Sequence, residues 1–184
     1  MSWRQLPNCI TVARLLMVPP VVWLIINRRY DAAWWLFVVA GLSDGLDGFL
    51  AKRFNWTTEL GGFLDPIADK LLMVSSIIAL TIQGLVPLWL TAAVVLRDVV
   101  IVAGAVAYRV LLGRFTAAPT IISKLNTLVL IMVVVGVLGA QWLNLDPDLW
   151  ALFGLSLVLT IGSGIDYVLQ WGQRARREWA TRAR

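Results

Sequence analysis

The sequence predicts an all-α, polytopic integral membrane protein with six transmembrane helices. Hydrophobic residues make up 59% of its 184 residues, and the mean hydropathy is +0.78. Charged residues make up 15%, below the ~25% that is usual in soluble domains. A soluble domain of this length could not bury so much apolar surface, so the composition indicates a membrane protein.

Six apolar segments each approximate the ~20 residues that are needed to cross a hydrocarbon core. They are Asn8–Ile26, Ala32–Ala51, Gly62–Ile82, Val86–Leu112, Ile121–Trp142 and Leu149–Trp171. The first segment lacks a small-residue cleavage site, so we expect a retained span and not a removed signal.

The basic residues predict the orientation of these spans. With a cytoplasmic N-terminus, one side of the membrane receives Arg4, Lys52, Arg53, Arg109, Arg114 and the arginines of the C-terminal tail. The other side receives Arg28 and Arg29 together with Asp31, Asp146 and Asp148. By the positive-inside rule both termini are therefore expected in the cytoplasm. We divide the chain into a six-helix membrane domain, residues 1–172, and a basic cytoplasmic tail, residues 173–184. The tail is expected to contact anionic lipid, not nucleic acid.

The chain has one cysteine and no histidine, and this limits the catalytic and metal-binding chemistry that its side chains can perform. Cys9 is the single cysteine, which excludes an intrachain disulfide. The chain has no histidine, so the usual zinc ligand and the usual general base at neutral pH are both missing. A proton acceptor must then be a carboxylate, a lysine, a tyrosine or water.

Four aspartates stand out in this apolar chain: Asp44, Asp47, Asp65 and Asp69. Each costs at least ~2.5 kcal/mol inside a membrane, so a cluster of four needs a compensating cation. The first pair is spaced i, i+3 and the second i, i+4, which places each pair on one helix face. Carboxylate oxygens from two helices suit Mg²⁺ or a similar divalent ion. Intramembrane acids also mark ion pathways, so a cation or proton transporter is the alternative.

The spacing around these aspartates resembles a known signature. Residues Asp44 to Lys52, followed by Gly61, Asp65 and Asp69, are similar to the motif D-x2-D-G-x2-A-R-x8-G-x3-D-x3-D of the CDP-alcohol phosphotransferase family. Seven of the eight fixed positions match, and Lys52 stands at the arginine position. Further segments resemble the phosphatidyltransferase branch of this family: Pro7-Asn8 with Thr11 and Arg14, Arg97-Asp98, and Ser123 to Thr127.

The resemblance implies a six-helix bundle with a polar cavity that opens to the cytoplasm. It implies transfer of a phosphatidyl group from CDP-diacylglycerol to an alcohol with release of CMP, supported by two Mg²⁺ or Mn²⁺ ions. By the same resemblance Asp44, Asp47 and Asp65 ligate metal, and Asp69 completes the second metal's shell and is the candidate general base. The implied nucleotide and diphosphate contacts are Asp44, Gly48, Ala51, Lys52 and Gly61. Lys52 can act there as a point charge but cannot reproduce the bidentate fork of arginine.

For the acceptor alcohol we expect contacts from Arg14, Arg97, Lys124 and Asn126. Adjacent helical residues do not face each other, so Arg97 and Asp98 are expected to do more than pair, and Arg97 to contact an anion. Asp166 is expected to be a hydrogen-bonded structural acid.

Asn126 bears on the choice of acceptor. It replaces the second lysine of the G-K-x-K-T pattern that is typical of the glycerol-phosphate branch. One fewer cation favours the monoanion phosphatidylglycerol, and hence cardiolipin synthesis. Glycerol-3-phosphate, and hence phosphatidylglycerophosphate synthesis, is the alternative. We expect a bacterial inner membrane location, and the resemblance implies a homodimer.

Overall fold

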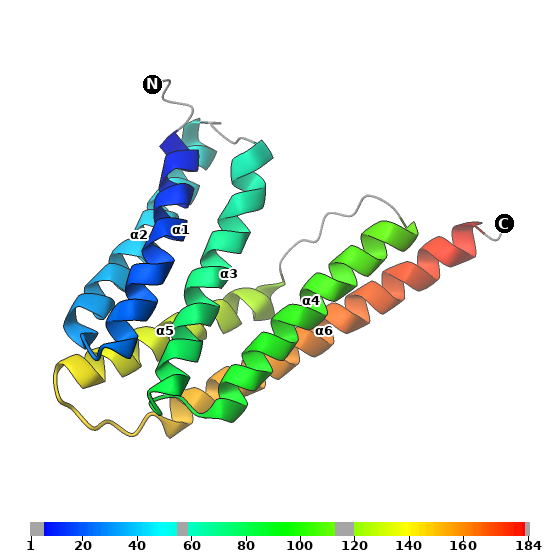
Figure 1. Cartoon of the computed structure of the whole chain (residues 1–184). Helices are drawn as coiled ribbons and strands as arrows, with labels where there is room; N and C mark the ends of the chain where they lie inside the picture. The colour runs from blue at the N-terminus through cyan, green and yellow to red at the C-terminus, as the bar shows by residue number, and fades with distance from the viewer. Residues whose placement is uncertain (1–5, 55–58, 113–119, 183–184) are drawn as a thin grey trace. The chain divides into compact units, whose positions relative to one another are not determined.

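The computed structural model describes the backbone of residues 6–54, 59–112 and 120–182, and the side-chain surroundings of residues 12–43, 68–104, 106 and 120–172. Within these residues the chain is all-helical, as predicted (Figure 1). The helices are α1 (Leu6–Ile26), α2 (Tyr30–Phe54), α3 (Glu59–Ile82), α4 (Leu88–Leu112), α5 (Ile121–Trp142) and α6 (Trp150–Arg182). The first five begin and end within a few residues of a predicted span.

Helix α6 continues beyond its predicted end at Trp171. Its backbone stays helical to Arg182, through most of the segment assigned to the tail. The boundary between residues 172 and 173 is therefore not a break in secondary structure. The basic side chains of this segment lie outside the described residues.

Two helical segments in the described part of the chain are long and apolar enough to cross a membrane. They are Ile121–Trp142 in α5 and Trp150–Gly172 in α6. A shorter apolar stretch, Val12–Ile26, covers most of α1.

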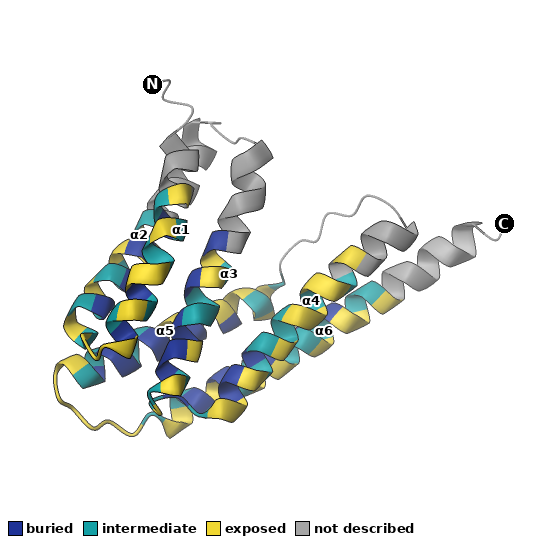
Figure 2. Ribbon diagram, viewed as in Figure 1, coloured by how far each residue is buried: buried dark blue, intermediate teal, exposed yellow. Residues whose placement is uncertain are grey.

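The chain forms two compact units. Unit 1 comprises Met1–Pro87 and Val134–Pro147, and unit 2 comprises Leu88–Val133 and Asp148–Arg184. In unit 1, α1 packs against both α2 and α3. Buried apolar side chains such as Val21, Phe37 and Ile77 form the core there (Figure 2). In unit 2, α4 packs along α6, with Leu90 and Val94 among the buried side chains.

Three helices of unit 1 end in the same way. Arg28 after α1, Gly84 after α3 and Asn144 after α5 have positive φ angles of 57°, 74° and 52°. At each end a pair of backbone hydrogen bonds closes the last turn, as Arg28 N to Ile25 O and Arg29 N to Leu24 O do after α1. This is the Schellman motif, in which a left-handed residue satisfies the last carbonyl groups of a helix. Glycine and asparagine are usual at this position, whereas arginine is not.

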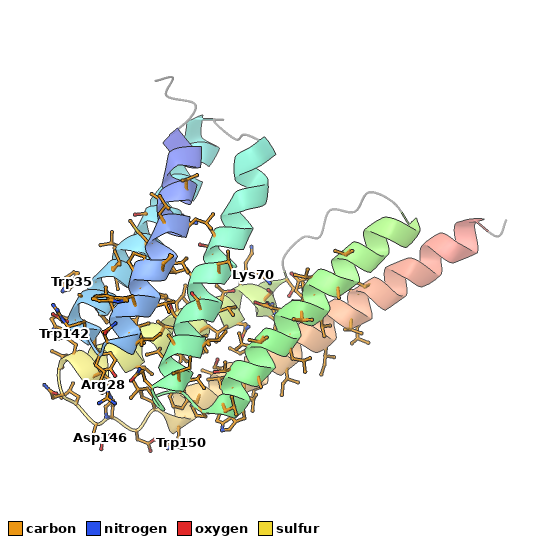
Figure 3. The ribbon with its side chains drawn as sticks, viewed as in Figure 1. Arg28, Trp35, Lys70, Trp142, Asp146 and Trp150 are labelled. Carbon is orange, nitrogen blue, oxygen red and sulfur yellow. The ribbon has the colours of Figure 1, made fainter. Side chains whose placement is uncertain are left out.

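Tryptophans at the start of α2 pack against the end of α5 in unit 1. The ring centroids of Trp34 and Trp142 are 5.5 Å apart, and Trp34 Nε1 donates a hydrogen bond of 3.2 Å to Val135 O. Figure 3 shows Trp35 and Trp142 at the same end of the unit as Arg28. Tryptophan prefers the boundary between apolar and aqueous surroundings, which suits this end of the helices.

Candidate active site

The predicted aspartate pairs lie on α2 and α3, the two helices that pack against α1. Asp44 and Asp47 are on α2, and Asp65 and Asp69 are on α3. The helical backbone gives each pair the spacing of one turn that the sequence predicted. Several predicted side chains lie outside the described residues: Asp44, Asp47, Gly48, Ala51, Lys52, Gly61 and Asp65. Their proposed metal and nucleotide contacts therefore stay predictions.

Asp69 is the motif aspartate whose side chain is described, and it is held by an arginine on α1. Arg14 Nη1 donates a hydrogen bond of 3.0 Å to Asp69 Oδ1. The Arg14 side chain is 1% exposed, and the Asp69 side chain is 48% exposed. The contact thus joins a fully buried guanidinium to a half-exposed carboxylate. The sequence predicted Arg14 as an acceptor contact and did not predict this pairing.

Arg97 lies in a buried polar network of unit 2. Its Nη1 donates to Asp98 Oδ1 at 2.7 Å, and its Nη2 donates to Ser123 Oγ and Ser163 Oγ, each at 2.7 Å. The Arg97 side chain is 9% exposed. Its guanidinium carbon also lies 5.7 Å from the ring centroid of Tyr167, within the range of a cation–π contact.

Arg97 and Asp98 form an ion pair although they are adjacent on α4. The arginine side chain is long and has several rotatable bonds, so its head can bend sideways to the neighbouring carboxylate although the two Cβ atoms diverge. The expectation that Arg97 does more than pair with Asp98 agrees with its two serine contacts.

One face of α4 meets one face of α6 around this network. Arg97 and Gly104, seven residues apart, share a face of α4. Ser163, Tyr167 and Trp171 recur every four residues on α6. An ideal Cβ at Gly104 would overlap the ring of Trp171, so any larger residue would require that ring or one of the helices to shift.

Asn126 and Lys124 lie on α5 in unit 2. Asn126 is 1% exposed, and its Oδ1 accepts a hydrogen bond of 2.9 Å from Thr160 Oγ1 of α6. Lys124 is exposed in the first turn of α5. Thr120 Oγ1 accepts from Ser123 N at 3.2 Å, which caps this helix start. The predicted acceptor contacts Lys124 and Asn126 therefore have different surroundings, one exposed and one engaged within the protein.

Asp166 is a hydrogen-bonded acid, as predicted. Its Oδ1 accepts from Gln170 Nε2 at 3.1 Å, one turn further along α6. A polar stripe on the same helix was not recognised from the sequence. Ser156, Thr160, Ser163 and Tyr167 are all buried and recur at helical spacing. That recurrence within an apolar span was the signal that could have identified the partners of Arg97 and Asn126.

A protein-family comparison covers most of the chain. Residues 4–162 match the family model described as CDP-alcohol phosphatidyltransferase. This range includes both aspartate pairs, Arg14 and Arg97. The chain belongs to this family. The resemblance that the aspartate spacing suggested is thereby confirmed.

Relatives with two kinds of name are similar to this chain. The human protein named "Cardiolipin synthase (CMP-forming)" is 36% identical over 161 residues, which cover 79% of this chain and 54% of the human protein. A Streptomyces coelicolor protein of the same name is 41% identical over 99 residues, covering 50% of this chain and 46% of its own. The Escherichia coli K12 protein named "CDP-diacylglycerol--glycerol-3-phosphate 3-phosphatidyltransferase" is 31% identical over 176 residues, which cover 89% of this chain and 93% of the E. coli protein. The chain thus spans about half the length of these cardiolipin synthases.

Proposed function

We propose that this chain is a membrane phosphatidyltransferase that transfers a phosphatidyl group from CDP-diacylglycerol to phosphatidylglycerol, forming cardiolipin and CMP. The observation that carries the proposal is the family's aspartate motif, with Asp69 exposed on α3 and its Oδ1 fixed by Arg14. The names of the human and Streptomyces relatives support phosphatidylglycerol as the acceptor.

The residues present suit the divalent ions that the motif implies. Asp44, Asp47, Asp65 and Asp69 offer carboxylate oxygens from two helices, and hard oxygen ligands are what Mg²⁺ and Mn²⁺ prefer. When bound, such ions would offset the negative charge of the diphosphate during transfer. Gly48, Ala51 and Gly61 would leave room for the nucleotide close to the helix backbones, and Lys52 would contact a phosphate.

In the proposed chemical step, Asp69 accepts the proton of the acceptor hydroxyl. The acceptor hydroxyl oxygen forms a bond to the phosphorus of the phosphatidyl group, and the bond from that phosphorus to the CMP phosphate oxygen breaks. CMP leaves, and the hydroxyl proton passes to the Asp69 carboxylate. An exposed carboxylate can accept a proton from an arriving substrate, which a fully buried group could not do without rearrangement.

The proposal includes six transmembrane helices with both termini in the cytoplasm of a bacterial cell. The five helices that match predicted spans, and the apolar segments of α5 and α6, support it. The acyl chains of both lipid substrates would then stay in the inner leaflet while their head groups enter the site. A homodimer is part of the proposal by family resemblance.

The glycerol-3-phosphate acceptor remains the second candidate, because the E. coli relative bears that name. An acceptor panel separates the two. Purified protein in lipid nanodiscs receives CDP-diacylglycerol, Mg²⁺ and one acceptor at a time: phosphatidylglycerol, glycerol-3-phosphate, inositol phosphate or serine. We expect CMP and cardiolipin, identified by mass spectrometry, with phosphatidylglycerol. A product formed only with glycerol-3-phosphate would select the second candidate.

The same assay tests the whole class of function. If no acceptor supports CMP release, the enzyme proposal fails. Ion flux through the protein in liposomes, lost on Asp44→Asn, would then favour the transporter alternative. In the enzyme, Asp69→Asn is expected to lower CMP release by about 10³-fold or more while sparing nucleotide binding, because amide nitrogen cannot accept the proton. Full turnover by this variant would remove Asp69 as the base.

A further inference from the structure

The buried position of Arg14 has a consequence for the carboxylate that it holds. Arg14 shares one face of α1 with Val21 and Ile25, seven and eleven residues further along, and both are fully buried. A guanidinium stays charged at any ordinary pH and is costly among such neighbours unless a carboxylate compensates it. The hydrogen bond to Asp69 Oδ1 supplies that compensation from a different helix.

The packing around Arg14 limits how far its head can move. Its side chain is 1% exposed, and α1 packs directly against α3. Asp69 by contrast is 48% exposed, so packing alone does not fix its orientation. The arginine is therefore the more confined partner of this pair, and its hydrogen bond constrains the orientation of the carboxylate.

We propose that Arg14 is a positioning residue, which fixes Oδ1 of Asp69 so that the carboxylate is correctly oriented toward the acceptor hydroxyl. This inference rests on the proposed function, in which Asp69 accepts the proton. It gives Arg14 a different role from the acceptor contact that the sequence suggested. A positioning residue acts on the chemical step, whereas an acceptor contact acts on acceptor affinity.

Two substitutions at Arg14 separate these roles. Arg14→Met keeps much of the apolar stem and removes the charge. We expect it to lower kcat for CMP release about 100-fold, with KM for phosphatidylglycerol changed less than about twofold, because a misplaced catalytic group slows chemistry without weakening uniform binding. Arg14→Lys keeps the charge and loses the planar fork, so kcat should recover about tenfold relative to Arg14→Met.

Ile77→Ala is the matched control, because Ile77 is fully buried on α3, eight residues from Asp69. It loosens packing in the same unit without removing the Arg14–Asp69 contact. Rates are expressed per folded protein, measured by size-exclusion profile and by binding of CDP-diacylglycerol. We expect Ile77→Ala to lower the melting temperature and keep kcat within about threefold of the parent, since core truncations act mainly on stability.

Several outcomes would overturn the proposal. A raised KM with unchanged kcat in Arg14→Met would make Arg14 an acceptor contact. An equal fall in kcat for Ile77→Ala would show that Arg14 acts through packing alone. If Arg14→Met fails to fold, Arg14→Lys still tests the proposal. A kcat equal to that of the parent protein in Arg14→Lys would contradict it. Activity of the parent protein separates this failure from failure of the proposed function: a parent that releases CMP leaves the function standing, and an inactive parent removes both.

Discussion

Among the described residues, each unit holds one arginine whose side chain is almost fully buried, and the two contact different kinds of partner. In unit 1 Arg14 reaches a carboxylate on another helix, and that carboxylate is exposed and belongs to the aspartate motif. In unit 2 Arg97 is surrounded by its own neighbour Asp98 and by serines of α5 and α6. In the first arrangement the buried guanidinium contacts a half-exposed carboxylate. In the second arrangement the guanidinium donates to acceptors that all belong to unit 2.

This difference indicates what each arginine contributes. A buried charge that donates to three internal acceptors stabilises the packing of the helices that carry them, and its removal should mainly affect folding. A buried charge with a carboxylate at the surface also determines how that carboxylate is presented. The following substitutions test this distinction through stability, from the largest expected effect to the smallest.

Arg97→Met should have the largest effect on stability. It removes the donor to Asp98, Ser123 and Ser163 at once, and breaking a buried ion pair by removing one partner typically costs about 3–5 kcal/mol. The free energy of unfolding in detergent micelles, from denaturant or thermal curves, measures it. Arg97→Lys should cost less, since one charged head remains. A loss below about 1 kcal/mol in Arg97→Met would show that the network does not hold α4, α5 and α6 together.

Gly104→Ala tests the helix crossing on which the Arg97 network depends. The added methyl group would overlap Trp171, so the ring or the helix must move, at a cost of about 1–3 kcal/mol. Gly164→Ala is the matched control on α6. Its Cβ would lie 3.6 Å from Arg97 Cγ, an ordinary contact, so alanine should gain about 0.5–1 kcal/mol from helix propensity. Equal stability changes for the two variants, measured by the same unfolding curves, would contradict the tight crossing.

Thr160→Val should have a smaller effect. It removes the hydroxyl that donates to Asn126 Oδ1 and keeps the side-chain shape, at a cost of about 1 kcal/mol. Ser76→Ala in unit 1 is the control, because the buried Ser76 hydroxyl donates to Leu72 O of its own helix, which is already in the helical ladder. We expect the melting temperature to fall clearly in Thr160→Val and little in Ser76→Ala. The reverse order would show that the contact between α5 and α6 is weak.

The sequence was sufficient for the parts of this structure that depend on nearby residues. The length of the apolar segments predicted all six helices, and the spacing of the aspartates placed each pair one turn apart. Partners distant in the chain were not predictable. Arg14 meets Asp69 across 55 positions and Arg97 meets Ser163 across 66, so each contact depends on how two helices pack. The acceptor role given to Asn126 came from charge alone, and burial against Thr160 is a property of packing that charge cannot reveal.

Arg28→Gly should have the smallest effect, and it provides the exposed counterpart to the two buried arginines. Arg28 follows α1 with a φ of 57°, where glycine is favoured, and its Nε lies 3.4 Å from Gln83 Oε1 at the surface. Glycine relieves about 1–2 kcal/mol of left-handed strain but costs about 0.5–1 kcal/mol in chain entropy and about 0.3–1 kcal/mol in lost attraction to the helix end. These terms nearly cancel, so we expect the unfolding free energy to change by less than about 0.5 kcal/mol, in line with the weakness of exposed polar pairs. A loss above about 1 kcal/mol in the same unfolding assay would mean that an arginine contributes substantially here without being buried.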